Sequence, residues 1–183
     1  RLCQHGVPVN HHLGVSGFAE WATVSRRSLV RVDPTLPFAE AALFGCAVIT
    51  GVGAVVNTAS MPRHSTLAVI GLGGVGLAAL LAGRMLESTA IIAIDLNEAK
   101  LAQARALGAT LAINAADPEC ETLVRAASGG GVAYAFEMAG SVRALELAYR
   151  ITRRGGTTVT AGLPHPQQQA SFSHVSLVAE ERT

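Results

Sequence analysis

The chain has 183 residues, of which half are hydrophobic and 15% are charged, and its formal net charge is +1. This charge is too small to suggest a nucleic-acid-binding surface. Three irregularly spaced cysteines argue against a disulfide framework and favour a reducing cytoplasm. The first residue is Arg and no signal peptide is visible, so we expect a fragment of a longer protein.

The mean hydropathy of +0.38 leaves two explanations open, a membrane protein or a domain with deeply buried strands. Residues 41–62 and 64–83 carry no charge and are long enough to cross a membrane. However, they contain several glycines and polar residues, and no cluster of Lys and Arg flanks either stretch. Parallel strands that are buried on both faces give the same apolar runs. We therefore predict a doubly wound domain and no membrane segment.

The N-terminal region differs in pattern from the rest of the chain. Residues 1–13 are polar and aperiodic and predict a loop, in which His11 and His12 are solvated. Residues 17–24 alternate loosely and residues 29–32 are apolar in part, so that each predicts a short strand. These short strands favour the end of a separate β-rich domain.

Residues 37–59 begin with good first-turn residues of a helix. Several glycines then interrupt the pattern. We predict two helices that meet near Gly45 and Cys46, the second from about residue 48 to 59.

The most informative stretch begins with the apolar run at residues 67–70, which predicts a buried parallel strand. Gly71, Gly73 and Gly76 follow it and fit the pattern G-x-G-x-x-G. The first glycine permits a tight turn, the second lets a diphosphate approach the backbone, and the third allows close packing of helix and strand. The helix starts near Gly74, with its free N–H groups and its dipole toward the phosphates.

A second apolar strand at residues 90–94 ends in Asp95, roughly 20 residues after the glycines. An acid at this distance accepts hydrogen bonds from the adenosine ribose in dinucleotide-binding domains. Because the strand, the helix and the acid all accompany the glycines, we predict a dinucleotide site and not a purely structural turn. Asp95 would repel a 2′-phosphate, which favours NAD over NADP.

Strands and helices continue to alternate after Asp95. The predicted helices are 98–107, capped by Asn97 and ended by Gly108, 118–127 and 141–151, and the predicted strands are 111–114, 132–137 and 157–161. This pattern predicts an α/β fold, a doubly wound parallel sheet of Rossmann type with strand order 3-2-1-4-5. A sixth strand is expected after residue 183, or at 175–179. Cys120 lies in a polar helical segment and gives no functional signal.

Ligands of such folds bind beyond the carboxyl ends of the strands, at the switch point between the first and fourth. Besides the glycine turn and Asp95, those ends carry Glu137-Met138-Ala139-Gly140 and Ala161-Gly162-Leu163. These residues either line the site or form plain turns, and the residues alone leave both interpretations open.

Several motifs together resemble the zinc-dependent medium-chain alcohol dehydrogenases. They are His11-His12-Leu13-Gly14, Gly17-Phe18-Ala19-Glu20-Trp21, Leu43-Phe44-Gly45-Cys46 with Thr50-Gly51, Gly71-Leu72-Gly73-Gly74-Val75-Gly76, Phe136-Glu137 with Gly140, and Gly162-Leu163-Pro164. The resemblance covers nearly the whole chain, and the Gly-Cys with Thr-Gly is its most specific part. It implies a partial GroES-like catalytic domain at residues 1–47 and an incomplete NAD-binding Rossmann domain at residues 48–183.

The resemblance also implies roles for individual residues. Taken alone, Cys46 in an apolar stretch favours a buried core cysteine, whereas the family context makes it one of three protein ligands of a catalytic zinc. Thr50 and Val75 would lie beside the nicotinamide, Lys100 near the ribose, and Ala161 at the carboxamide pocket. The other two catalytic ligands and the structural-zinc cysteines would lie upstream of residue 1.

The resemblance therefore implies hydride transfer between an alcohol or aldehyde and NAD, with zinc as a second cofactor, in a cytoplasmic homodimer or higher homo-oligomer. The fragment alone is expected to be inactive. Two alternatives are a zinc-free medium-chain reductase of the quinone or enoyl type and a non-catalytic Rossmann module that senses nucleotides.

Overall fold

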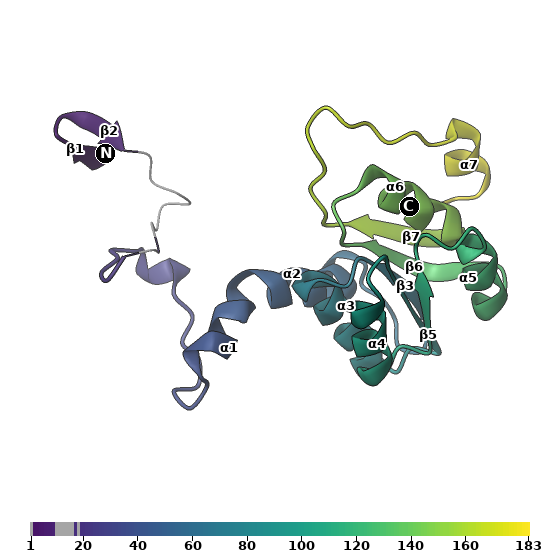
Figure 1. Cartoon of the computed structure of the whole chain (residues 1–183), viewed down its shortest axis with the longest axis horizontal. Helices are drawn as coiled ribbons and strands as arrows, with labels where there is room; N and C mark the ends of the chain where they lie inside the picture. Colours follow the sequence, from purple (N-terminus) through teal and green to yellow (C-terminus); the bar gives the residue numbers. More distant parts are fainter. Residues whose placement is uncertain (1, 10–16, 18) are drawn as a thin grey trace. The chain divides into compact units, whose positions relative to one another are not determined.

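The structure is a computed structural model that describes residues 2–9, 17 and 19–183. The chain divides into two compact units, Arg1–Ala41 and Ala42–Thr183, and each is described by itself (Figure 1). The motif at residues 11–14, with its two histidines, lies outside the described residues.

The first unit contains a small antiparallel hairpin of β1 (Leu2–Gln4) and β2 (Val7–Val9). The two residues between these strands, His5 and Gly6, both have positive φ, 51° and 78°. Two successive positive φ values are typical of the tight turn that matches the twist of hairpin strands. The prediction of a loop at residues 1–13 was therefore wrong for residues 2–9, where a single glycine is the only turn signal in the sequence.

The strands predicted at residues 17–24 and 29–32 are absent from the residues of these ranges that the structure describes. Residues 19–24 and 29–32 have no regular structure, and between them lies only a short 3₁₀ helix, η2 (Arg26–Ser28). Leu29 has extended dihedral angles, φ −102° and ψ 132°. Extended backbone becomes a strand only when a neighbouring strand accepts its hydrogen bonds, and among the described residues of this unit no such neighbour is present.

Residues 38–58 form one continuous helix, not the two that the glycines predicted. It consists of α1 (Phe38–Leu43), the π-helical segment η3 (Phe44–Val48), α2 (Ile49–Gly53) and the π-helical segment η4 (Ala54–Thr58). A glycine costs a helix only about 1 kcal/mol, which packing can offset. By length and composition alone this helix could cross a membrane. Its second half nevertheless packs against protein, since a Cβ on Gly51 would lie 2.2 Å from the Val75 carbonyl oxygen.

The second unit is built on a five-stranded parallel sheet in the order β5-β4-β3-β6-β7, which confirms the predicted order 3-2-1-4-5. The strands are β3 (Thr66–Ile70), β4 (Ala90–Asp95), β5 (Leu111–Asn114), β6 (Val132–Glu137) and β7 (Thr152–Thr160). Four of them lie close to the predicted ranges. β7 begins earlier than predicted, directly after the preceding helix, and pairs irregularly with the start of β6.

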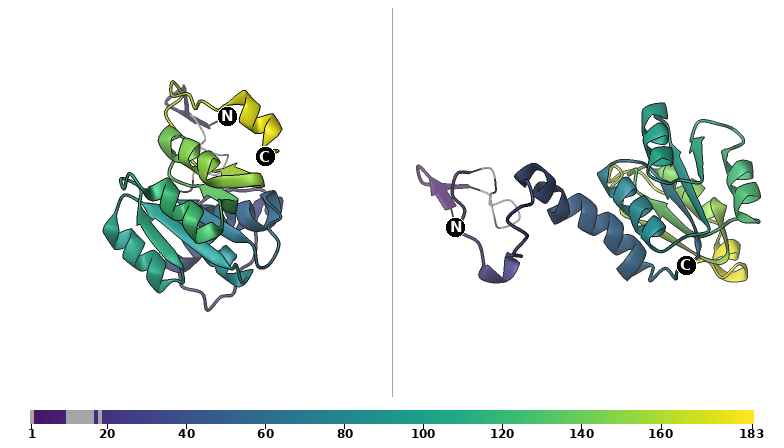
Figure 2. Two further views of the ribbon diagram at one scale, coloured as in Figure 1. Left: turned by 90° about the vertical axis from the view of Figure 1, so that its right-hand side faces the viewer. Right: turned by 90° about the horizontal axis from the view of Figure 1, so that it is seen from below.

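Helices cover both faces of this sheet, as the views in Figures 1 and 2 show. α3 (Gly74–Met85) and α4 (Glu98–Ala106) contribute to one apolar core, and α5 (Cys120–Ser128) and α6 (Val142–Ile151) contribute to the other. Successive residues of a strand point to opposite faces. In β3, for example, Leu67 and Val69 are buried in the first core, and Ala68 and Ile70 in the second. The doubly wound fold is confirmed.

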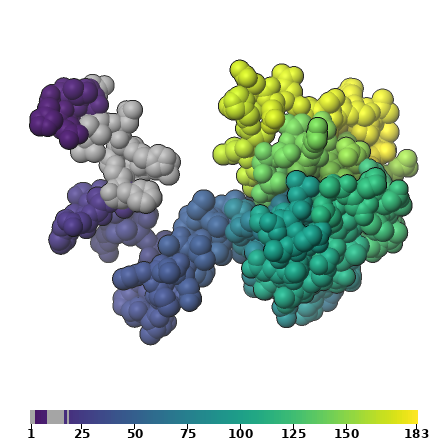
Figure 3. All heavy atoms as spheres, in the orientation of Figure 1, coloured from purple at the N-terminus to yellow at the C-terminus, as the bar shows by residue number. Residues whose placement is uncertain are grey.

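The C-terminal segment does not contain the strand that was predicted at residues 175–179 as one of two possible sixth strands. Residues 175–179 are not a strand but belong to a short helix, α7 (His174–Ala179), which Ser173 caps. After this helix the backbone bonds to the edge of β7, with the Thr158 N–H 2.7 Å from the Thr183 carbonyl oxygen. Figure 3 shows these yellow residues beside the green surface of α6, and the Tyr149 hydroxyl lies 2.8 Å from Ser176 Oγ.

Candidate functional site: a cleft at the switch point of the sheet

The glycine turn after β3 is packed so closely that two of its positions admit no side chain. Gly71 has a φ of +92°, and a Cβ there would lie 2.7 Å from the Ala139 nitrogen. A Cβ on Gly76 would lie 1.8 Å from the Gly71 carbonyl oxygen. At Gly73, by contrast, a Cβ would meet nothing within 4 Å. The third glycine therefore serves helix packing, and the middle one faces open space where a ligand can approach.

The helix that follows, α3, begins without a side-chain cap. Gly73 is its N-cap residue, no side chain bonds to the first turn, and Gly73 and Gly74 are both exposed. The first N–H groups of a helix have no partner within the helix. On the next helix, α4, the Asn97 side chain accepts hydrogen bonds from two such groups. The start of α3 thus keeps free donors and a partial positive charge for an anion.

Asp95, at the end of β4, is hydrogen-bonded to the glycine turn itself. Its Oδ2 accepts a hydrogen bond from the Leu72 N–H at 2.7 Å, and its Oδ1 accepts one from the Asn97 N–H at 2.9 Å. Lys100 Nζ lies 3.8 Å from the same Oδ2. A carboxylate offers about four acceptor positions, so after these two hydrogen bonds it can still accept two more. Asp95 can therefore hold the turn and bind a pair of hydroxyl groups together.

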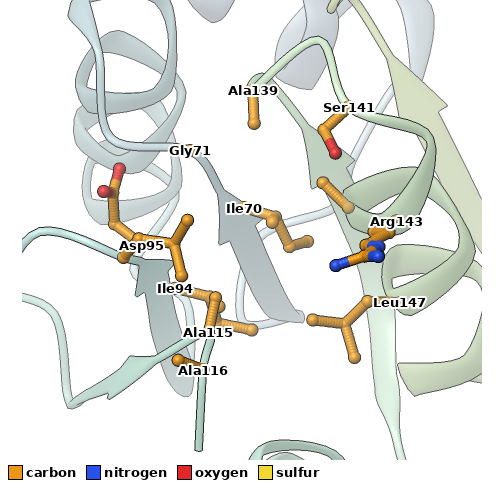
Figure 4. Close-up of a pocket in the computed structure, with 12 residues that line it drawn as sticks. Ile70, Gly71, Ile94, Asp95, Ala115, Ala116, Ala139, Ser141, Arg143 and Leu147 are labelled. Atoms are coloured by element: carbon orange, nitrogen blue, oxygen red, sulfur yellow. The ribbon is translucent and has the colours of Figure 1, made fainter.

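Asp95 lines a cavity of about 350 Å³ between the ends of the strands (Figure 4). Its side chain lies on one side and Arg143 lies on the opposite side, with Ile70 between them and Leu147 below Arg143. The lining is completed by Gly71, Ile94, Leu96, Ala115, Ala116, Ala139, Ser141 and Ala144. A mostly apolar hollow with a few convergent polar groups is typical of small-ligand sites.

A second, shallower hollow of about 320 Å³ lies between α2 and the end of β7. It brings together Thr50 and Ala161, which are far apart in the sequence. Next to it, a Cβ on Gly162 would lie 2.2 Å from the Gly140 nitrogen, so this glycine is required by close packing. Leu163 is 93% exposed. Val75, in the first turn of α3, is half-buried.

Comparison with known proteins identifies the family. Residues 74–183 match the family of zinc-binding dehydrogenases. The chain belongs to this family. The match includes every strand of the sheet except β3, and it includes α3, the helix that follows the glycine turn. It confirms the family resemblance that the sequence motifs indicated.

Solved structures of alcohol dehydrogenases share the fold of this zinc-binding dehydrogenase chain. An alcohol dehydrogenase zinc-binding domain protein from Burkholderia ambifaria is 33% identical with a TM-score of 0.87, over 92% of this chain and 45% of that one. Benzyl alcohol dehydrogenase from Acinetobacter calcoaceticus is 32% identical with a TM-score of 0.85, over 92% and 46%. An alcohol dehydrogenase from Thermus sp. ATN1 is 28% identical with a TM-score of 0.78, over 84% and 44%. The chain thus spans less than half of each of these proteins.

Because the family is one of zinc-binding dehydrogenases and cysteine is a common zinc ligand, the environment of Cys46 is of interest. Cys46 lies in η3 and is exposed. The interpretation of Cys46 as a buried core cysteine was therefore wrong. Within the described part of the chain, no three His, Cys, Asp or Glu residues lie close enough together to hold a metal ion. A zinc site needs three or four such ligands, so these residues do not form one by themselves.

Cys120 is buried, although the helical segment around it is polar in composition. It is 4% exposed and packs in the core between the sheet, α5 and α6. Burial, with smaller contributions from Asp117 and Glu121, raises the pKa of its thiol to about 11.

Sequence reasoning missed two features of the site. It assigned Asp95 only to the ribose and did not predict the hydrogen bond to Leu72. It also named Glu137 as a strand-end residue without giving it a role, and it passed over Arg143, which lies in the first turn of α6. The available signal was position, since charged residues at the carboxyl ends of parallel strands gather at one edge of the sheet.

Proposed function

We propose that this chain is the coenzyme-binding part of an alcohol dehydrogenase that transfers hydride between NAD and an alcohol or aldehyde. One observation carries the proposal. Asp95 and the glycine turn are joined by the 2.7 Å hydrogen bond to the Leu72 N–H, so a ribose acceptor and a diphosphate-binding turn form one unit. The names of the alcohol dehydrogenase relatives support the reaction class.

The adenosine half of NAD fits the larger cavity. Its apolar walls would cover the adenine base, while the two remaining acceptor positions of Asp95 would bind the ribose hydroxyls. Lys100 Nζ lies 3.8 Å from Asp95 Oδ2, so its positive charge would lie near the same ribose. A 2′-phosphate would meet the Asp95 charge, and NADP is therefore disfavoured.

The diphosphate would bind the exposed start of α3. The N–H groups of Gly74 and Val75 are helix donors without an intrahelical partner, and the open space at Gly73 lets the phosphates approach them. The nicotinamide would then extend toward the second hollow, where Thr50 and Ala161 lie. When bound, NAD supplies the hydride acceptor, and these residues fix the face of the ring that receives the hydride.

Cys46 is proposed to supply one ligand to a catalytic zinc. Its exposed thiol is compatible with this role, but the described residues contain no group of three potential ligands around it. A zinc ion at Cys46 would therefore need ligands from outside the described residues. The chain would therefore bind the coenzyme, and we expect no turnover of alcohol by the chain alone.

The test is a fluorescence titration of the purified chain with NADH, which we expect to show saturable binding. In the variant Asp95→Ala the affinity for NADH should fall at least about tenfold, because the hydrogen bonds from the ribose hydroxyls to a charged carboxylate are lost. The variant should also narrow the preference for NADH over NADPH, because the repulsive charge is gone.

Glu119→Ala is the matched control, since Glu119 is an exposed acid and the variant changes the net charge equally. NADH affinity should stay unchanged in this variant. An absence of saturable binding by the wild-type chain, or equal affinities of NADH for wild type and Asp95→Ala, would refute the proposed function.

A further inference from the structure

Glu137, the last residue of β6, is a buried acid with no role in the function proposed above. Its exposed fraction is 1%. Among the described residues, no Lys, Arg or His forms an ion pair with it. A buried carboxylate is stable only when hydrogen bonds replace its lost hydration. The donors that surround it therefore indicate what it is for.

All of those donors come from the ends of two strands. Oε1 accepts hydrogen bonds from the backbone N–H groups of Ala139 at 2.8 Å and Gly140 at 2.7 Å, and a longer one from Ser141 at 3.4 Å. Oε2 accepts one from the Thr160 hydroxyl at 2.6 Å. Residues 139–141 lead from β6 into α6, whereas Thr160 ends β7. One carboxylate thus ties the turn after β6 to the end of the next strand.

The turn held in this way is packed between two other parts of the cleft. On one side, a Cβ on Gly71 would lie 2.7 Å from the Ala139 nitrogen, so the turn contacts the glycine turn after β3. On the other side, a Cβ on Gly162 would lie 2.2 Å from the Gly140 nitrogen and 2.7 Å from Glu137 Oε2. A shift of the turn would therefore move both neighbours.

Each hollow of the site has a wall that this carboxylate fixes. Ala139 and Ser141 line the larger cavity, and Thr160 and Ala161 line the shallower one. Glu137 itself lines neither. We propose that Glu137 is a positioning residue. It fixes the side of the larger, adenosine cavity that Ala139 and Ser141 form relative to the side of the shallower, nicotinamide hollow that Thr160 and Ala161 form, without touching the coenzyme. This inference rests on the proposed binding of NAD.

The experiment compares NADH with ADP-ribose, which lacks the nicotinamide, on the whole chain. In Thr160→Val only the bond to β7 is lost, and Oε1 keeps its backbone partners. We expect NADH affinity to fall about tenfold, while ADP-ribose affinity changes little. Thr160 is exposed and the change is nearly isosteric, so the variant should fold.

Glu137→Ala and Glu137→Gln complete the test. The alanine variant leaves the turn and Thr160 without an acceptor, so both NADH and ADP-ribose should bind at least about tenfold more weakly. In the glutamine variant, the amide oxygen can accept from the turn and the amide nitrogen can donate to Thr160 Oγ1. It should bind both ligands nearly as the wild type does. The Thr160→Val variant separates positioning from folding, because a role in folding alone would not change the ratio of its affinities for NADH and ADP-ribose.

Two sets of outcomes separate this inference from the proposed function. If the wild-type chain binds neither NADH nor ADP-ribose, the proposed function fails. If the wild type binds both, the inference is overturned when Thr160→Val lowers the two affinities equally or leaves both unchanged. It is also overturned when Glu137→Gln is as weak as Glu137→Ala. Should Glu137→Ala not fold, the Thr160→Val ratio decides alone.

Discussion

α3 and α6 follow the neighbouring strands β3 and β6, but the turns that lead into them are satisfied in different ways. The turn into α3 ends in the exposed Gly73 and Gly74 and has no side-chain cap. The turn into α6 surrounds the carboxylate of Glu137, which accepts hydrogen bonds from the backbone N–H groups of Ala139 and Gly140. Both turns present N–H donors and the positive end of a helix dipole. In the turn into α6 a side chain of the protein satisfies these donors, whereas in the turn into α3 they stay available to a ligand.

The first prediction breaks the close packing on which the open turn depends. In Gly76→Ala the new Cβ would lie 1.8 Å from the Gly71 carbonyl oxygen, a backbone atom that moves only if the whole turn moves. We expect the free energy of unfolding, measured by urea denaturation, to fall by more than about 3 kcal/mol.

Gly73→Ala is the matched control for this variant. The backbone φ of Gly73 is −77°, which alanine adopts freely, and the new Cβ would meet nothing within 4 Å. Its stability should change by less than about 1 kcal/mol. A similar loss of stability in both variants would contradict the assignment of the third glycine to packing and the middle one to ligand access.

The second prediction concerns two cysteine thiols, one near α3 and one near α6. Cys46 is exposed on the helix that packs against α3, whereas Cys120 is buried beside α6. Because burial raises the pKa of Cys120 to about 11, the folded chain retains a proton that the unfolded chain releases near about pH 8.5. The free energy of unfolding should therefore fall as the pH rises from about 9 to about 11.

Urea denaturation across this pH range measures the effect, and Cys120→Ala should show a shallower decline than the wild type. In the native chain at about pH 8, a thiol reagent should modify Cys46 readily and Cys120 hardly at all. Rapid modification of Cys120, or identical pH dependence of the two proteins, would show that the α6 side of the sheet is not closed.

The smallest effect is expected at the far end of α3. There Glu87 has a φ of +52°, a conformation that glycine adopts without strain. Glu87→Gly should therefore raise the free energy of unfolding by up to about 1 kcal/mol. Loss of the exposed ion pair with Arg63 offsets part of this gain. A thermal melt measures the change, and a lower melting temperature would mean that the ion pair outweighs the backbone strain.

The fold of the second unit could be predicted from local patterns. Strands buried on both faces give continuous apolar runs, and Asn97 and Gly108 mark the two ends of one helix in the way that their backbone chemistry requires. The helix at residues 38–58 was less predictable. Its glycines look like breaks in the sequence, but Gly51 is a point of close contact with α3, and such a contact depends on a distant segment.

The N-terminal strands were wrong for a related reason. Residues 17–24 and 29–32 have strand-like composition, but a strand exists only with a neighbour to bond to, and composition does not reveal the neighbour.

The sequence by itself determined the parallel sheet, its strand order and the positions of the glycine turn and Asp95, because these depend on residue periodicity and on chain chemistry within about 30 residues. Only the tertiary structure decided that Asp95 bonds to Leu72, that Cys46 is exposed while Cys120 is buried, and that Glu137 joins β6 to β7. These features depend on atoms from segments that are distant in the sequence and meet only when the sheet has formed.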